Sequence, residues 1–341
     1  MRAPVAQISC CKSHCEAGRR RSVRKRPGIT TEAVSVVKGL TARRPVHLLY
    51  HGIRDRDASC VDAETFERQV LFLKKYFEVG RLTPDAGAAE GERPRVTISF
   101  DDGYRNNAEI AAPILKRHEV PATFFVCGRH SRGRGLLWFS YLEALETCFG
   151  GGGFDYHGEF IDMSAEARRD NMERLRRHLL SLRPHPEAMY QEIEANLPSI
   201  GDFLDEHDLR MRYAGLTEEQ IGQLSACDLF SVQAHTEDHP FLPSCTAAEA
   251  HRQLDENKRW IERITGTPCT EVAYPGGDYD EGTISLCRRT GFTRGFAVMS
   301  KNLTSPEYEI PRIGIYARSL SVLAVKLVFG HQIRAWGIPV G

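Results

Sequence analysis

Short apolar runs alternate with amphipathic segments along most of this chain. Residues 96–100 (VTISF) combine β-branched and aromatic side chains, a pattern that favours a buried strand. Residues 62–77 instead place Phe66, Val70 and Leu73 three or four positions apart, which predicts a helix with one apolar face. The same patterns predict further strands at 46–51, 120–126, 230–234, 271–275, 296–299 and 310–316, and further helices at 110–115, 247–264 and 279–290.

This order of strands and helices predicts an α/β fold with a parallel sheet. The repeated β/α units favour a distorted and incomplete (β/α) barrel, which we expect to occupy residues 45–320. Residues 136–225 are charged, amphipathic and mostly helical, and glycines 150–153 interrupt them. We interpret them as a helical insertion, either a lid over the sheet or a structural addition. Residues 321–341 would form a C-terminal extension.

The overall charge, the apolar runs and the composition of residues 1–44 bear on the partners and the location of the protein. Forty-five basic and 45 acidic side chains cancel, so no overall field favours a nucleic acid as partner. No apolar run approaches the ~20 residues of a membrane span. Residues 1–44 are polar and basic and lack the apolar core of a signal peptide, so we expect a disordered tail and a cytoplasmic location. A nucleic-acid-binding arm is the less favoured interpretation of this tail.

Ten cysteines are present, and most are scattered without short paired spacings. Scattered thiols in a long chain favour a reducing compartment over a disulfide framework. Cys10, Cys11, Cys15 and His14 could ligate a metal, but no second half of a zinc module follows them. We therefore do not expect a structural zinc site in the tail.

Candidate chemistry lies directly after two predicted strands. Asp101 and Asp102 follow the strand at 96–100, where ligands collect in α/β folds, although Asp-Asp-Gly could also be only a turn. His235 and His239 follow the strand at 230–234 and could meet one metal ion if the backbone turns between them. With 13 histidines, chance alone gives about half of one such pair, so the position after a strand matters more than the spacing.

Three motifs in this order resemble a known family. Residues 99–104 (SFDDGY) resemble the first motif of the polysaccharide deacetylases, the NodB-like carbohydrate esterases of family 4. Residues 235–240 (HTEDHP) resemble the second motif, and residues 273–280 (AYPGGDYD) a variant of the third. Each motif follows a predicted strand, and the resemblance covers about 46–316 apart from the insertion. It implies a distorted (β/α) barrel of the NodB type.

The resemblance also implies a site and a reaction. Asp102, His235 and His239 would bind a divalent metal, often zinc, and Asp101 would act as the general base towards a water. The family pattern places an oxyanion donor at the backbone N–H of Gly276. The substrate would be an acetylated glycan, from which N-acetyl groups of amino sugars are removed. An O-acetyl esterase, another amide hydrolase of this fold and a non-catalytic glycan-binding relative are the alternatives.

Two positions depart from the family pattern. The general acid usually comes from a Leu-x-His motif late in the domain, which is missing here, and His331 fits it poorly. Residues 49–51 (LYH) fit better, with His51 at the end of the first strand, as in relatives with a circularly permuted arrangement, although His51 could be a structural histidine. Ala273 replaces the arginine that orients the catalytic aspartate in the family. Arg312 is the candidate replacement, with a structural salt bridge as the equal alternative.

Overall fold

The computed structural model describes residues 45–54, 60–82, 93–316 and 319–335. These residues form a nine-stranded sheet, in which neighbouring strands pair in parallel. The strands of this sheet are β1 (Val46–Tyr50), β2 (Glu78–Val79), β3 (Arg95–Phe100), β4 (Ala122–Val126), β7 (Phe230–Ala234), β8 (Glu271–Ala273), β9 (Arg294–Ala297), β10 (Ile310–Pro311) and β11 (Ile313–Gly314).

The sheet curls into a nearly closed barrel. Its strand order is β10-β9-β8-β7-β4-β3-β1-β11, with β2 paired to β3 outside this path. The two ends of the path, β10 and β11, are successive parts of one segment that Arg312 separates. The first part pairs with β9 and the second with β1, so this segment joins the two edges of the sheet. The predicted distorted (β/α) barrel is therefore confirmed.

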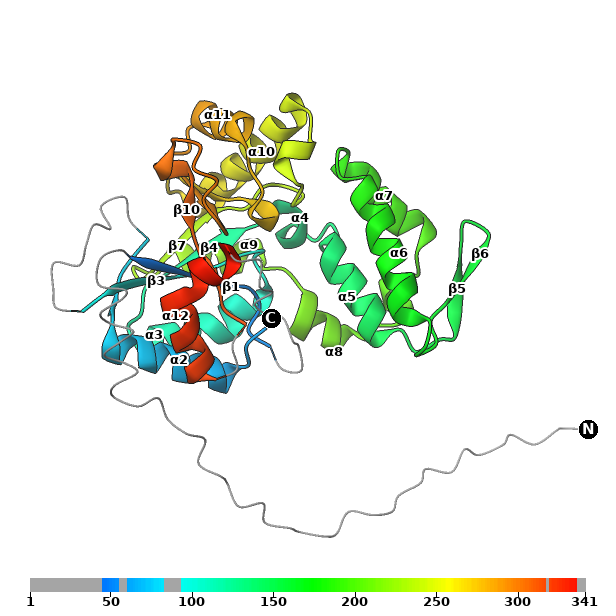
Figure 1. Ribbon diagram of the computed structural model, residues 1–341, viewed down its shortest axis with the longest axis horizontal. Helices are drawn as coiled ribbons and strands as arrows, with labels where there is room; N and C mark the ends of the chain where they lie inside the picture. Colours follow the sequence, from blue (N-terminus) through cyan, green and yellow to red (C-terminus); the bar gives the residue numbers. More distant parts are fainter. Residues whose placement is uncertain (1–44, 55–59, 83–92, 317–318, 336–341) are drawn as a thin grey trace, which may run out of the picture.

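Helices surround the barrel, apart from those of the insertion, which projects from one side (Figure 1). Most of them lie between successive strands, as a parallel sheet requires, and the C-terminal helix follows the last strand. In chain order they are α2 (Ala63–Tyr76), α3 (Ala112–Arg117), α4 (Gly128–Ser131), α5 (Trp138–Cys148), α6 (Arg168–Ser181), α7 (Pro186–Asn196), α8 (Glu206–Asp208), α9 (Glu218–Ser225), α10 (Ala247–Thr265), α11 (Glu281–Thr290) and α12 (Leu320–Ala335). Short 3₁₀ and π segments are η1 (Asn107–Ala111), η2 (Ile200–Asp202), η3 (Leu209–Tyr213), η4 (Leu242–Ser244), η5 (Pro275–Gly277) and η6 (Pro306–Tyr308).

Local sequence signals set the helix ends. At the start of α9, the Thr217 hydroxyl accepts a hydrogen bond from the Gln220 N–H, and the Gln220 side chain accepts one from the Thr217 N–H, which is a capping box. Helix α10 begins after Thr246, whose hydroxyl accepts from the Glu249 N–H. It ends at Gly266, where φ is 63° and glycine avoids the steric penalty of a left-handed residue.

Aromatic side chains fill the space between the first strands and the outer helix α2. Phe100 of β3 packs with Tyr50, Phe66 and Phe124 at ring-centroid distances of 5.6, 5.7 and 5.0 Å. All four are at most 1% exposed. Burying each such side chain stabilises the fold by about 1.5–3 kcal/mol. The strands are buried on both faces because helices cover the outside of the barrel, which explains their continuous apolar runs.

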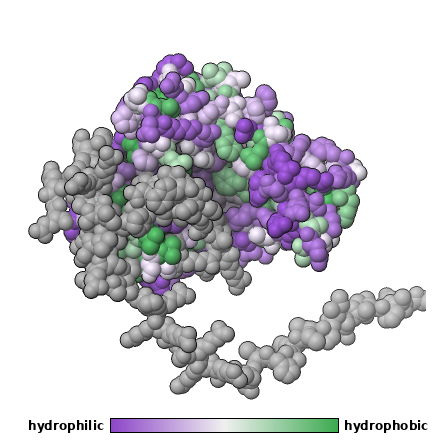
Figure 2. Space-filling view, in the orientation of Figure 1, coloured by the Kyte–Doolittle hydropathy of each residue, from purple (hydrophilic) through white to green (hydrophobic). Residues whose placement is uncertain are grey.

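The insertion has a hydrophobic core of its own, built by residues from Leu136 to Tyr213. It projects from one side of the barrel and its visible face is mainly hydrophilic (Figures 1 and 2). The glycine run leads into an antiparallel hairpin, β5 (Gly153–Tyr156) and β6 (Glu159–Asp162), which periodicity did not predict. The helix α9, which we assigned to the insertion, contributes Ile221 and Leu224 to the core of the barrel instead.

The C-terminal helix α12 packs against α2 and places Leu323 and Leu327 in the barrel core. The expected tail, residues 1–44, lies outside the described residues, and so do Cys10, Cys11, Cys15 and His14. Within the described ranges all cysteines are free, and no helix combines the length and apolar character needed to cross a membrane.

Candidate functional site

The candidate residues gather at one rim of the barrel. Parallel strands end on the same side of the barrel. Five of them are followed, directly or within three positions, by a residue that the sequence analysis singled out. His51 follows β1, Asp101 and Asp102 follow β3, and His235 follows β7. The remaining two strand ends, those of β8 and β10, lead to Gly276 and Arg312 respectively. The parallel order of the sheet therefore brings together segments that are distant along the chain.

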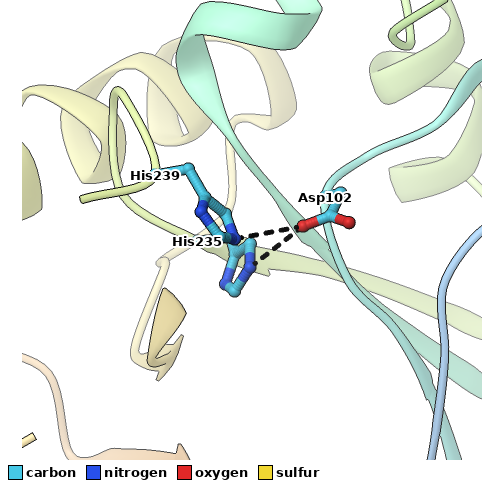
Figure 3. A group of neighbouring side chains, drawn as sticks. All are labelled: Asp102, His235 and His239. Carbon is cyan, nitrogen blue, oxygen red and sulfur yellow. Dashed lines mark ion pairs between the residues drawn. The ribbon is translucent and has the colours of Figure 1, made fainter. Parts of the chain in front are cut away.

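Asp102, His235 and His239 point their polar atoms at one another (Figure 3). The Asp102 Oδ1 atom lies 3.3 Å from Nε2 of His235 and 3.4 Å from Nε2 of His239. A tetrahedral zinc ion with bonds of about 2.0–2.2 Å holds its ligand atoms about 3.3–3.5 Å apart. The two measured distances therefore fit one ion among the three side chains.

Neighbouring groups orient the two imidazoles for such a role. Nδ1 of His235 donates a hydrogen bond to the Ala273 carbonyl (2.9 Å), which orients the ring so that Nε2 faces Asp102. Burial lowers the pKa of His239, whereas the carboxylates Asp101 and Asp102 outweigh burial at His235 and raise its pKa. Oδ2 of Asp102 is buried and has no hydrogen-bond partner among the described residues. The donor set therefore fits a bound cation.

Two polar side chains on α10 fix the segment that carries both histidines. Asn257 accepts a hydrogen bond from the His235 N–H (3.0 Å) and donates one to the Val126 carbonyl (3.1 Å). The Gln253 side chain accepts from the Asp238 N–H (2.7 Å). Both side chains are fully buried. The sequence did not lead us to them, although two amides four positions apart on the buried face of an amphipathic helix are a usable signal.

Left-handed backbone conformations concentrate at this site. Asp102, Thr236 and His239 have φ values of 72°, 64° and 53°, although none is a glycine. Such residues are uncommon, and they persist where the surrounding structure holds them. The turns place Asp102 and His239 so that their side chains face each other across the rim.

Asp101 lies beside this group but contacts a different partner. Arg312 donates to both of its carboxylate oxygens, with Nη1–Oδ1 and Nη2–Oδ2 distances of 2.7 Å each. Arg312 is 1% exposed and also donates to the Ser99 hydroxyl (3.2 Å). Burial alone would raise the pKa of Asp101, but the charges of Arg312 and His235 outweigh it and hold this pKa below its ordinary value. Asp101 is therefore ionised and oriented.

His51 is close enough to both carboxylates to affect them. Burial would raise the pKa of Asp102, but hydrogen bonds from His235 and His239 and the charge of His51 hold it well below the ordinary value. The charge of His51 also contributes to lowering the pKa of Asp101. Its ring stacks on Tyr316, with centroids 5.8 Å apart and an interplanar angle of 18°. The structure thus places His51 at the same rim.

Aromatic side chains and a glycine turn border the three candidate ligands. The ring of Phe139, at the start of α5, lies 4.9 Å from that of His239. Trp138 contacts Phe241 at 6.1 Å, so the insertion reaches the site through α5. Gly276 is exposed and has φ of 63°, and an added Cβ would lie 3.0 Å from the Phe241 ring. The sequence analysis assigned α5 to the insertion as a whole and did not predict that its aromatic residues would border the site.

Replacing Arg312 with Gln is expected to destabilise the protein by about 3–5 kcal/mol, because Asp101 would remain buried without its charged partner. Acetate release would fall as well, if the hydrolysis proposed below is correct, because the carboxylate would lose its fixed orientation. Urea-induced unfolding measures the first effect. A change below about 0.5 kcal/mol, as for an ordinary surface substitution, would contradict the assigned interaction.

Arg294 offers a matched control for this prediction. It is also buried, and it pairs with Glu271 at the opposite, amino-terminal ends of β8 and β9. Arg294→Gln should therefore lose stability in the same way while each folded molecule keeps its activity. Equal losses of specific activity in both variants would show that Arg312 acts only through stability.

Comparison with known proteins gives one family. The model of the polysaccharide deacetylase family matches residues 88–149 and 188–295, and the interval between them lies inside the insertion. The chain is 21% identical over 260 residues to YxkH of Bacillus subtilis, which is named as a candidate polysaccharide deacetylase. That match covers 74% of this chain and 64% of the relative.

Solved structures show the same fold. The deacetylase PplD of Streptococcus pyogenes, solved in complex with acetate, superposes with a TM-score of 0.50 at 17% identity, covering 80% of this chain and 92% of that one. IcaB from Ammonifex degensii gives 0.51 at 17% identity, with 84% and 97% covered. A polysaccharide deacetylase from Bacillus cereus gives 0.52 at 16% identity, with 84% and 69% covered.

Proposed function

We propose that this chain, which belongs to the polysaccharide deacetylase family, uses a divalent metal to remove N-acetyl groups from amino sugars of a polysaccharide or glycan precursor. The observation that carries the proposal is the placement of Asp102 against His235 and His239, at 3.3 and 3.4 Å, with a second, separately paired carboxylate at Asp101. One acid is thus available for a cation and the other for proton transfer.

A divalent ion held by Asp102, His235 and His239 would supply Lewis-acid chemistry, polarising an acetyl carbonyl and acidifying a water. Asp101 would accept the proton of the attacking water. Arg312 occupies one lone pair on each oxygen of Asp101 and leaves the others open for that proton. The lowered pKa of Asp101 keeps it ionised before attack.

Two further groups complete the proposed reaction. The backbone N–H of Gly276 would donate a hydrogen bond to the oxyanion that develops at the carbonyl oxygen of the acetyl group. His51 would donate a proton to the leaving amine, since its ring lies within electrostatic reach of both carboxylates. Its stacking on Tyr316 would hold the imidazole in one orientation.

Replacing His51 with Ala is expected to slow acetate release by about 10²-fold, the lower end of the range for general acid catalysis, because water can still protonate the amine. Bound metal should stay unchanged, since His51 is not among the three proposed ligands. Initial rates and metal content measured on the same preparation check both statements. His207→Ala, at an exposed histidine on α8, is the control and should match the unaltered protein.

A substrate panel tests the proposal directly. The full chain, loaded with Zn²⁺, would be offered N-acetylated amino-sugar oligomers and O-acetylated oligomers of matched length, and released acetate would be measured. We expect release from the N-acetylated set that disappears after chelation. Release from the O-acetylated set alone would make the protein an esterase, and glycan retention without acetate would make it a binding protein.

A further inference from the structure

A second group of metal-binding side chains lies in the insertion, away from the barrel rim. It consists of His157, His178 and Glu192, which come from three different elements. His157 lies in the turn between β5 and β6, His178 in the last turn of α6, and Glu192 on α7. The hairpin is therefore tied to both helices at one point.

The geometry of this group resembles that of the rim site. Oε1 of Glu192 lies 2.7 Å from Nε2 of His157 and 3.6 Å from Nε2 of His178. These values bracket the separation of about 3.3–3.5 Å between ligand atoms on a tetrahedral zinc ion. All three ligand atoms lie within 4.8 Å of one another. The side chains of His157 and His178 are 53% and 43% exposed, which leaves an ion access from solvent.

The carboxylate is held in place by groups that would not themselves be ligands. The Tyr156 hydroxyl donates to Oε1 of Glu192 at 2.5 Å, and the Asn196 amide donates to Oε2 at 3.0 Å. Hydrogen bonds of this kind orient ligating carboxylates in metal sites. Glu192 is the least exposed member of the group, at 15% for its side chain. The anion is therefore oriented in advance, with two imidazoles in front of it.

The backbone conformation of the hairpin turn is a further observation that concerns this group of side chains. His157 and Gly158 have φ values of 53° and 78°, as in a tight two-residue turn that favours Asn-Gly. Residues other than glycine are uncommon in this conformation, although histidine is enriched there together with asparagine and aspartate. Here the conformation directs the His157 ring towards Glu192. The same combination, a left-handed histidine facing a carboxylate, occurs at His239 of the rim site.

We propose that His157, His178 and Glu192 bind a second divalent transition-metal ion, which links the β5–β6 hairpin to α6 and α7. Two imidazoles and one carboxylate leave a fourth, solvent-facing position for water. The family model does not match residues 150–187, which carry both histidines, so this site would belong to the insertion and not to the shared barrel. It is separate from the proposed reaction and does not depend on it.

Zinc content per chain tests the proposal. The full chain would be stripped with a chelator and dialysed against buffered Zn²⁺, and bound zinc would be measured for the unaltered protein and for His178→Ala and His157→Asn. The second substitution suits the turn because asparagine tolerates its left-handed backbone. Each variant should bind one zinc fewer per chain. Zinc content equal to that of the unaltered protein in both variants would overturn the proposal.

Two further variants make the count specific. His251→Ala, at an exposed histidine on α10, should change nothing, and His239→Ala should lose the zinc of the rim site instead. The combination His178→Ala with His239→Ala should lose both equivalents. Because only differences between variants are compared, zinc bound elsewhere on the chain cancels. His178→Ala should keep the activity of the unaltered protein, so a missing deacetylase activity would not affect the zinc result.

Discussion

Replacing Asp101 with Asn is expected to lower acetate release by about 10⁴-fold, the upper end of the range for general acid–base catalysis. The amide cannot accept a proton from the attacking water, and the neighbouring carboxylate, Asp102, is already directed at two imidazoles. The proposed ligands are untouched, so metal content should equal that of the unaltered protein. Initial rates, corrected for bound metal, measure the effect.

The main confounding effect in this variant is the buried charge that remains. The neutral amide introduced by Asp101→Asn would no longer balance the charge of Arg312, and a loss of stability should accompany the loss of activity. The assay therefore has to be run at a temperature where circular dichroism shows the variant fully folded. Turnover within tenfold of the unaltered protein, under those conditions, would exclude Asp101 as the base.

Replacing His239 with Ala is expected to remove the metal from the rim and to lower acetate release by at least about 10²-fold. Loss of a residue that only hydrogen-bonds to a metal ligand costs up to about 10²-fold, and loss of a ligand itself should cost more. Only two of the three proposed ligands would remain. Metal analysis and initial rates would be measured in a His178→Ala background, so that zinc at the insertion does not obscure the count.

Added metal distinguishes this variant from Asp101→Asn. Excess Zn²⁺ should partly restore activity in His239→Ala, because mass action can refill a weakened site. The same addition should not help Asp101→Asn, whose site is already filled. Full zinc content in His239→Ala without any added metal would contradict the proposed ligand set.

Local patterns in the sequence were sufficient to predict the elements whose structure depends on residues close together in the chain. Apolar runs of five to seven residues predicted β1, β3, β4 and β7. The hairpin β5–β6 was missed because its strands are short and half exposed, so no alternation marks them. Helix α9 was wrongly assigned to the insertion, because the spacing of its apolar residues does not show which core they enter.

The candidate site likewise has features that the sequence predicts and contacts that only the tertiary structure shows. By itself the sequence determined the barrel, the family, and the acids and imidazoles that follow the strands, because strand ends and motifs are local features. Only the tertiary structure decided that Arg312 contacts Asp101, that His51 reaches the same rim, and that His157, His178 and Glu192 meet in the insertion. These pairings join residues that are distant along the chain, and the closure of the sheet and the packing of helices determine which of them touch.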